Sequence, residues 1–121
     1  MMMNGIKYYN IKEEIWLQIK GFPGYYINQF GQVKRRYKNG KELILKQHQN
    51  RDGYYRVKLF NKSIKKNYRV NRLILEVFTG TTNQVSHHID NNRQNNNIWN
   101  LKWLTIKENN QPENRKQKVS D

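Results

Sequence analysis

Two adjacent histidines, His87 and His88, lie in the polar segment VSHHIDNN, far from His48, the third histidine of the chain. An Asn-Leu pair begins at Asn100, twelve residues after His88, and Asn109 follows nine residues later. A neutral imidazole has an ordinary pKa of about 6.5 and can accept a proton from water near neutral pH. A histidine pair alone is typical of an exposed surface without a function. The spacing to the two asparagines favours a functional site.

The charge of the chain is strongly one-sided. Its 121 residues include 23 Lys or Arg and 9 Asp or Glu, which gives a net charge of +14. Fourteen of the cations and only two acids, Glu42 and Asp52, lie between Lys34 and Arg72. Such a concentration favours a polyanionic partner, most often nucleic acid, over a basic surface kept for solubility. The chain has no cysteine, which excludes disulfides and fits a reducing cytosol.

The N-terminal half predicts short antiparallel strands. Glycines and a proline interrupt the apolar runs from Gly21 to Gly31, as in turns between strands. In GYYRVKLF, apolar and cationic residues alternate, so one face would pack on a core while the other presents cations. Asn-Gly favours a tight hairpin turn. The expected elements are strands near 25–28 and 31–37 around a turn at Gly31, a turn at Asn39-Gly40 with a strand after it, a strand over 53–60, and a further turn and strand over 61–70.

A helix and a strand-loop-strand-helix unit are expected in the second half. Apolar residues from Val70 to Phe78 follow helical spacing, with Asn71 as the possible cap and Gly80 as the end. QVSHH reads as a strand, DNNRQNNN as a loop and NLKWLT as a second strand. TIKE is a capping box, which predicts a helix from Ile106 that Pro112 would shorten or bend.

The segment VSHHIDNNRQNNNIWNLKWLTIKENNQ resembles the ββα-metal (HNH, His-Me finger) motif of phage homing endonucleases. EEIWLQIKGFPGYYINQFGQVKRR resembles the nuclease-associated modular DNA-binding domain that precedes the motif in that family. GYYRVKLF and YRVNRLILEVFTG resemble the usual connection between them. The likeness covers roughly residues 13 to 111. It implies an α+β fold, with small antiparallel sheets in the N-terminal half followed by the nuclease motif.

The resemblance implies a role for each matched residue. His88 corresponds to the general base, and Asn100 to the residue that braces the loop and orients this base. His87 and Asn109 correspond to the ligands of one divalent metal ion, Mg²⁺ or Mn²⁺. The family commonly has Asp at the position of His87, so softer ions such as Co²⁺ or Ni²⁺ are also expected to bind. It commonly has His at the position of Asn71.

Neighbouring residues on a regular strand point to opposite faces, so His87 and His88 can serve one site only if the strand bends or ends there. Asp90 is expected to brace the loop, Trp99 and Trp103 to pack in the core, and His48 to lie on the surface. Arg93 is expected either to touch a phosphate or to be a solvated loop residue. The expected DNA contacts are Lys34, Arg35, Arg36, Arg56, Lys58, Lys65, Lys66, Arg69 and Arg93.

The predicted organisation is a lead-in at 1–12, a basic, mainly β, DNA-binding domain at 13–70, the connecting helix and nuclease motif at 71–111, and a charged tail at 112–121. The predicted function is a metal-dependent endonuclease of phage homing type that acts on double-stranded DNA and leaves 5′-phosphate and 3′-hydroxyl ends. The alternatives are a DNA-binding protein with a decayed nuclease site and a basic RNA-binding or ribosomal protein. A monomer is expected in the cytoplasm, which would be that of a bacterial host if a phage encodes the protein, and no membrane segment is expected.

Overall fold

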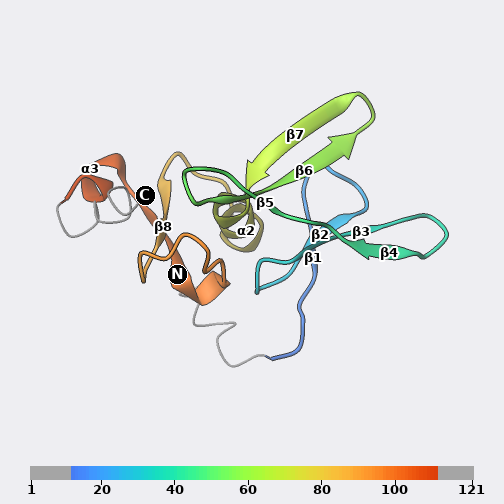
Figure 1. Ribbon diagram of the computed structural model, residues 1–121, viewed down its shortest axis with the longest axis horizontal. Coiled ribbons are helices and arrows are strands. Elements are labelled where there is room, and N and C mark those ends of the chain that lie inside the picture. Colours follow the sequence, from blue (N-terminus) through green and yellow to red (C-terminus); the bar gives the residue numbers. More distant parts are fainter. Residues whose placement is uncertain (1–11, 112–121) are drawn as a thin grey trace.

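The computed structural model describes residues 12–111 and shows an α+β fold, in agreement with the sequence prediction (Figure 1). Short strands fill the first part of this range, and a helix, a hairpin and a second short helix follow. The elements are β1 (Leu17–Gln18), β2 (Tyr25–Ile27), β3 (Val33–Arg36), β4 (Glu42–Ile44), β5 (His48–Gln49), β6 (Tyr55–Asn61), β7 (Ile64–Arg69), α2 (Val70–Thr79), β8 (Val85–His88), the 3₁₀ turn η1 (Ile98–Asn100), β9 (Leu101–Leu104) and α3 (Ile106–Asn109).

All strand pairs are antiparallel, and they form three small sheets with the orders β1-β2-β3-β4, β5-β6-β7 and β8-β9. The predicted turn at Gly31 joins β2 to β3, and the Asn39-Gly40 turn joins β3 to β4. Gly31 has a φ of 86°, and a Cβ there would lie 3.1 Å from Asn96. Glycine is therefore required at this turn both by the backbone conformation and by the approach of the loop that carries Asn96.

Strand β6 shows the predicted alternation. Val57 and Leu59 are buried, whereas Lys58 and Phe60 are exposed. Burying an aliphatic side chain of this size stabilises the fold by about 1.5–3 kcal/mol relative to leaving it exposed. The face with Val57 and Leu59 therefore fixes which side of the hairpin presents its cations to solvent.

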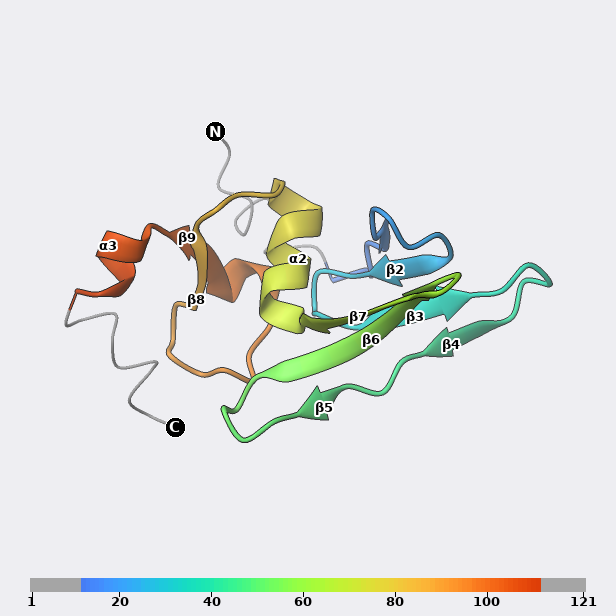
Figure 2. The same ribbon diagram turned by 90° about the horizontal axis from the view of Figure 1, so that it is seen from above.

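Helix α2 joins the sheets to the C-terminal hairpin and packs against β1, β6, β7, β8, β9 and η1 (Figure 2). Its buried side includes Leu73, Ile74 and Phe78, as the helical spacing predicts. Gly80, with a φ of 102°, ends the helix, as predicted. The expectation that Asn71 caps it is wrong, because the helix begins one residue earlier at Val70 and the side chain of Asn71 is used elsewhere.

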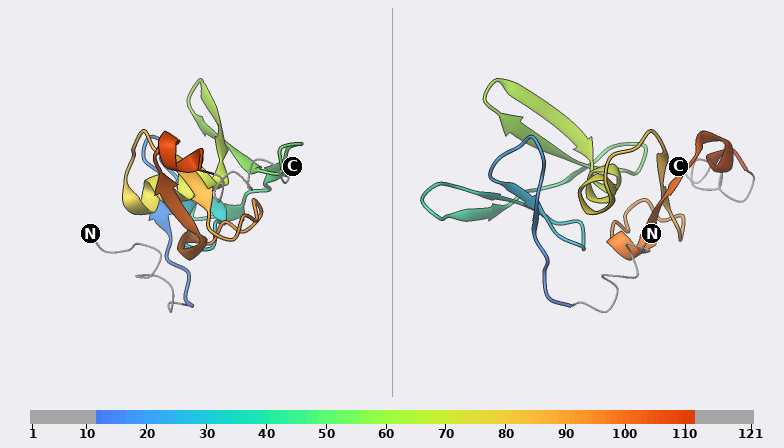
Figure 3. Two further views of the ribbon diagram at one scale, coloured as in Figure 1. Left: turned by 90° about the vertical axis from the view of Figure 1, so that its left-hand side faces the viewer. Right: turned by 180° about the vertical axis from the view of Figure 1, so that it is seen from behind.

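The hairpins β3–β4 and β6–β7 extend on the side of the molecule away from α3 (Figure 3). The β8–β9 hairpin lies between α2 and α3. Neither helix of the part described, from residue 12 to residue 111, has the length and apolar character needed to cross a membrane. Pro112 and the tail after it lie outside the described residues, as does nearly all of the predicted lead-in.

Candidate active site

The β8–β9 hairpin and α3 carry the matched residues in the predicted order. In the hairpin, His87 is paired with Lys102 and His88 with Leu101. The predicted capping box starts α3: Thr105 Oγ1 accepts from the Glu108 N–H at 3.1 Å, and Glu108 Oε1 accepts from the Thr105 N–H at 2.8 Å. These bonds satisfy backbone donors at the helix start and so fix where the helix begins after β9.

The strand ends at His88, as a shared site for the two histidines requires. A turn follows, in which the Asn91 N–H donates to the His88 carbonyl at 2.9 Å. Asn91 has a φ of 61°, a conformation that asparagine tolerates better than most residues. Both histidines are buried, His87 with 4% and His88 with 0% of its surface exposed.

Asn96 orients the ring of His88. Nε2 of His88 lies 2.8 Å from Oδ1 of Asn96. Because a carbonyl oxygen can only accept, Nε2 donates here, and the neutral ring then carries its basic lone pair on Nδ1. Burial lowers the pKa of His88 below its ordinary value, although the hydrogen bond to Asn96 and the charge of Asp90 oppose this shift. The ring is therefore held neutral, in one tautomer, at neutral pH.

Asn100 joins the two ends of the loop after His88. Its side-chain N–H groups donate to Asp90 Oδ1 and to the Asn95 carbonyl, both at 2.9 Å, and its Oδ1 accepts from the Asp90 N–H at 3.2 Å. Its backbone carbonyl accepts from the Ile89 N–H at 2.7 Å. Burial alone would raise the pKa of Asp90, but hydrogen bonds from Asn95, Asn100 and the Asn92 backbone hold it below the ordinary value. Asp90 therefore remains an ionised acceptor at the centre of the loop.

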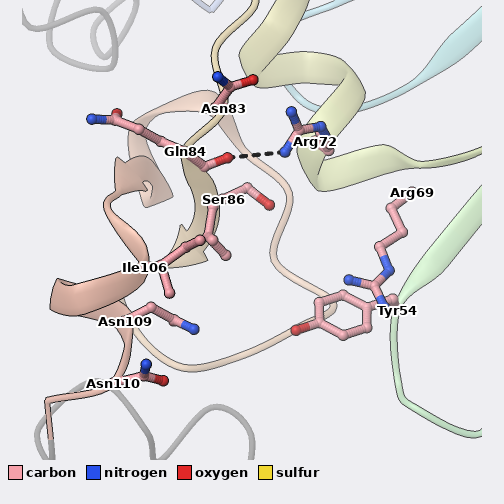
Figure 4. A pocket seen from close by; sticks show the side chains of 10 residues that line it. Tyr54, Arg69, Arg72, Asn83, Gln84, Ser86, Ile106, Asn109 and Asn110 are labelled. Carbon is pink, nitrogen blue, oxygen red and sulfur yellow. Dashed lines mark hydrogen bonds between the residues drawn. The ribbon is translucent and has the colours of Figure 1, made fainter.

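A cavity of about 410 Å³ lies beside the hairpin (Figure 4). Its walls combine α3, the segment before and into β8, Arg72 of α2, Arg69 at the end of β7 and Tyr54 just before β6. Asn109 lines it, and its side chain forms no hydrogen bond with other residues in the described range 12–111. Neither His87 nor His88 lines the cavity. Among the described residues, the lining consists of Tyr54, Arg69, Arg72, Asn83, Gln84, Val85, Ser86, Ile106, Asn109 and Asn110.

Two residues of α2 hold β8 in place. Nδ2 of Asn71 donates to Ser86 Oγ at 2.6 Å, while its Oδ1 is buried without a hydrogen bond to any described residue. Arg72 donates from Nη1 to the Gln84 carbonyl at 3.0 Å and from Nη2 to the Thr82 carbonyl at 2.8 Å. The side-chain amide of Asn71 thus connects the helix to the strand of the two histidines through a hydrogen bond, which the sequence pattern did not predict.

The nine cations expected to contact DNA differ in their surroundings. Three of the partly buried ones have partners within the chain: Lys34 reaches Glu42 at 3.2 Å, Arg35 donates to the Tyr25 hydroxyl at 2.8 Å, and Arg56 reaches Asp52 at 2.6 Å. The exposed ones, which are the better candidates for phosphate contacts, are Arg36, Lys58, Lys65, Lys66 and Arg69.

Arg93 is neither exposed nor solvated. It retains 7% of its surface, donates from Nη1 to the Asp52 carbonyl at 2.5 Å, and lies 4.7 Å from the centre of the Tyr54 ring. The interpretation of Arg93 as a solvated loop residue is therefore wrong, and its contact with a phosphate stays a prediction. Its place between the loop after β8 and the turn before β6 indicates that it joins the two halves.

Tyr54 and Asn96 were not singled out in the sequence. The Tyr54 ring lies 6.0 Å from the ring of His88 and lines the cavity. Asn96 is one of three consecutive asparagines, so residue type alone could not distinguish it. The signal in the sequence that bears on Asn96 is Gly31, where a Cβ would lie 3.1 Å from Asn96. This signal depends on a tertiary contact, so it could be recognised only once the fold was known. The expectations for His48, on the surface, and for Trp99 and Trp103, packed against the core, are confirmed.

The residues around the cavity suit a metal ion that takes few protein ligands. Within residues 12–111, no group of three or more His, Cys, Asp or Glu side chains could hold a metal. Asn109 lines the cavity, and His87 is a buried imidazole on β8 that does not line it. Mg²⁺ and similar ions commonly keep several waters and bind one or two protein groups together with a substrate phosphate. Asn109 and a phosphate at the cavity fit this mode of binding, and a bond from His87 to the metal stays a prediction.

Two family models match the chain. Residues 14–60 match the NUMOD4 motif, and residues 68–111 match HNH endonuclease. DNA endonuclease I-HmuI of Bacillus phage SP01 is 38% identical over 96 residues, which cover 76% of this chain and 53% of that protein. An uncharacterized HNH endonuclease of Acanthamoeba polyphaga mimivirus is 35% identical over 96 residues, which cover 78% of this chain and 28% of the relative.

A solved structure, described as DNA binding and cleavage by the HNH homing endonuclease I-HmuI, matches with a TM-score of 0.72 and 34% sequence identity. The match covers 88% of this chain and 60% of that one. The chain thus spans about half or less of the length of the curated relatives named here. The two family matches together extend over most of the described residues, in the order that the sequence predicted. The chain therefore belongs to the HNH endonuclease family, with a NUMOD4 motif before its HNH segment.

Proposed function

We propose that the protein is a divalent-metal-dependent endonuclease that binds double-stranded DNA and hydrolyses its phosphodiester bonds, leaving 5′-phosphate and 3′-hydroxyl ends. The observation that carries the proposal is the state of His88: a buried imidazole at the end of β8, held through Nε2 by Asn96, so that Nδ1 is the basic atom. A fixed neutral imidazole suits a general base, which typically contributes about 10²–10⁴-fold to a rate. HNH endonucleases generally use a divalent metal.

In the proposed mechanism, Nδ1 of His88 accepts a proton from the attacking water. Asn96 holds the ring, and Asn100 fixes the loop that follows it. His87 and Asn109 would hold the metal ion, which, when bound, would neutralise charge on the phosphate and stabilise the departing 3′ oxygen. The exposed cations of β6 and β7 bind the phosphates of the flanking DNA.

A plasmid-nicking assay tests the proposal. Supercoiled plasmid should be nicked or linearised when Mg²⁺ or Mn²⁺ is added and should remain intact with a chelator. DNA ligase should reseal the nick directly, because it requires 5′-phosphate and 3′-hydroxyl ends. His88→Ala should lower the rate by at least about 10²-fold and still bind DNA, whereas the exposed control His48→Ala should cut normally. Unchanged cleavage by His88→Ala would remove the assignment of the base.

The same assay separates the alternatives. A DNA-binding protein with a decayed site would retard plasmid DNA without nicking it under any metal. An RNA-binding protein would prefer RNA to DNA in a competition experiment. The homing-type role, a monomeric state and a cytoplasmic location remain proposals of the same kind.

A further inference from the structure

The wall of the cavity that faces α3 comes from the basic N-terminal half of the molecule. Tyr54 precedes β6 and Arg69 ends β7, and both line the cavity together with Asn109 (Figure 4). The guanidinium of Arg69 lies 4.2 Å from the centre of the Tyr54 ring. We propose that Arg69 and Tyr54 bind the phosphate that is cleaved, so that Arg69 is a catalytic residue supplied by the β5–β6–β7 sheet. This inference rests on the proposed function.

Of the two arginines that line the cavity, Arg69 has guanidinium N–H groups available for a ligand, whereas those of Arg72 are used within the chain. Arg72 donates from Nε to Glu76 and from both Nη atoms to backbone carbonyls, as described above. Arg69 has 48% of its side chain exposed, and its acidic neighbour Asp52 lies 3.6 Å from Nη2. That carboxylate makes its shorter contact, at 2.6 Å, with Arg56. An arginine fork placed in this way matches the geometry of two phosphate oxygens.

The cavity is suited to an anion. None of the residues that line it in the described range 12–111 is acidic. The nearby carboxylates are already paired: Asp52 with Arg56, and Glu76 with Arg72. Hydrogen bonding from Arg56 holds the pKa of Asp52 well below its ordinary value, so this carboxyl group stays ionised and bound to that arginine. Asp52, which is 3.6 Å from Arg69 and closer to Arg56, therefore offsets the charge of Arg69 only in part. The remaining charge can stabilise charge that develops on a phosphate at the cavity surface.

Tyr54 is held in position for the same ligand. Arg69 lies over its ring at 4.2 Å and Arg93 at 4.7 Å, while His88 lies 6.0 Å away. In Figure 4 its hydroxyl points across the cavity toward α3, which carries Asn109. A ring fixed by two guanidinium groups loses little further freedom on binding, so its hydroxyl is ready to donate to a phosphate oxygen. The volume of about 410 Å³ lies within the range of about 300–1,000 Å³ that is usual for small-ligand pockets.

Arg69→Ala, Arg69→Lys and Tyr54→Phe, with Lys66→Ala as the matched control, test this assignment. Lys66 is an exposed cation on the same strand and does not line the cavity. Single-turnover nicking is measured at saturating DNA and metal, beside DNA affinity and thermal melting. Arg69→Ala should lower the saturating rate by about 10²-fold, the usual effect of removing one preorganised donor. Tyr54→Phe should lower it by about tenfold, and Arg69→Lys should fall between Arg69→Ala and the wild type. Lys66→Ala should weaken affinity, and the exposed control His48→Ala should change neither the affinity nor the saturating rate.

A second measurement does not depend on cleavage. Inorganic phosphate, and separately the dinucleotide TpT, are titrated into metal-free protein while the Arg69 Nε–H signal and the Tyr54 ring signals are followed by NMR. Both ligands should shift these signals in the wild type and leave the Tyr54 signals unmoved in Arg69→Ala. If the wild type never nicks DNA but shows these shifts, the proposed function fails and the phosphate site stands. If Arg69→Ala loses affinity alone, or if the signals do not move, Arg69 does not hold the cleaved phosphate.

Discussion

At the scale of single residues, the protonation of His88 follows from its surroundings. Burial favours the neutral ring, which lowers the pKa, while the bond to Asn96 favours the ring that carries a proton on Nε2. The same burial makes the fold sensitive to acid. The unfolded chain binds a proton below about pH 6.5, whereas the folded chain resists it to a lower pH. Stability should therefore fall as the pH drops from that value toward the lower folded pKa, and should be unaffected by His88 at higher pH.

Asn96→Asp should move the acid limb of the rate profile. In the wild-type protein, kcat/KM should decrease with acid only below about pH 6.5, because the His88 ring stays neutral in the folded state down to that pH. A carboxylate at residue 96 would stabilise the imidazolium and raise the pKa of His88. The limb should then shift to higher pH, and Asn92→Asp, an exposed change in the same loop, should shift it less. A profile identical to that of the wild type would mean that residue 96 does not set the protonation of the base.

The two matched asparagines should respond differently to metal. Asn109→Ala removes an amide oxygen at the cavity, so the metal concentration for half-maximal activity should rise and excess metal should restore part of the rate. Asn100→Ala removes bonds that join Asp90 to Asn95, so the rate at saturating metal should fall with little change in metal requirement. A metal titration of both variants and of Asn109→Asp, which keeps a ligand oxygen, decides between the roles. Metal rescue of Asn100→Ala alone would reverse the two assignments.

Residue 87 should set the preference among metal ions. Histidine is a softer ligand than aspartate, so His87→Asp should increase the rate with Mg²⁺ relative to Mn²⁺ and Ni²⁺. Because His87 is 4% exposed, melting must accompany the rates, to separate a change in preference from loss of the fold. The exposed change His48→Asp is the control for the added charge. Equal metal profiles for the wild type and His87→Asp would place residue 87 outside the metal site.

At the scale of elements, local patterns predicted most of the structure. The alternation in β6, the helical spacing after Val70 and the capping box of α3 are all confirmed, because each depends on residues close in the sequence. The errors arise from long-range contacts. Asn71 donates a hydrogen bond to Ser86, fifteen residues away, and does not cap its helix. Arg93 donates a hydrogen bond to the backbone carbonyl of Asp52, forty-one residues away. Such partners are chosen by the packing of the halves, which no local pattern contains.

The capping box should matter to the metal site as well as to stability. Thr105→Ala removes the side-chain acceptor for the Glu108 N–H, a change that typically costs about 1 kcal/mol. The melting temperature should drop by about 2–8 °C. The half-saturating metal concentration should rise, because Asn109 belongs to the helix that the cap starts, while the acid limb of His88 should stay in place. Thr82→Ala, which lies outside the two helices, is the control in the metal titration. An unchanged metal requirement in Thr105→Ala would mean that α3 does not contribute to metal binding.

At the scale of the whole molecule, the basic surface should govern affinity for DNA through its exposed members. Each phosphate contact contributes a slope of about −0.9 to the dependence of log affinity on log salt concentration. Lys65→Ala should therefore reduce the slope by about one unit and weaken all DNA sequences alike. Arg56→Ala should instead lower the melting temperature, because Asp52 would lose its closest partner. Equal slopes for Lys65→Ala and the wild type would place the β6–β7 hairpin outside the DNA contact.

The boundary between the two family matches falls within a single hairpin. The NUMOD4 match ends at residue 60 and the HNH match begins at residue 68, while β6 runs to Asn61 and pairs along its length with β7, which ends where α2 begins. A recombination breakpoint between the two matches would therefore separate the paired strands β6 and β7. It would also separate the HNH segment from Tyr54, which lines the cavity beside it. We therefore expect the β6–β7 hairpin to be inherited together with the α2–β8–β9–α3 segment. Recombination between related genes should then exchange the hairpin and this segment as one unit.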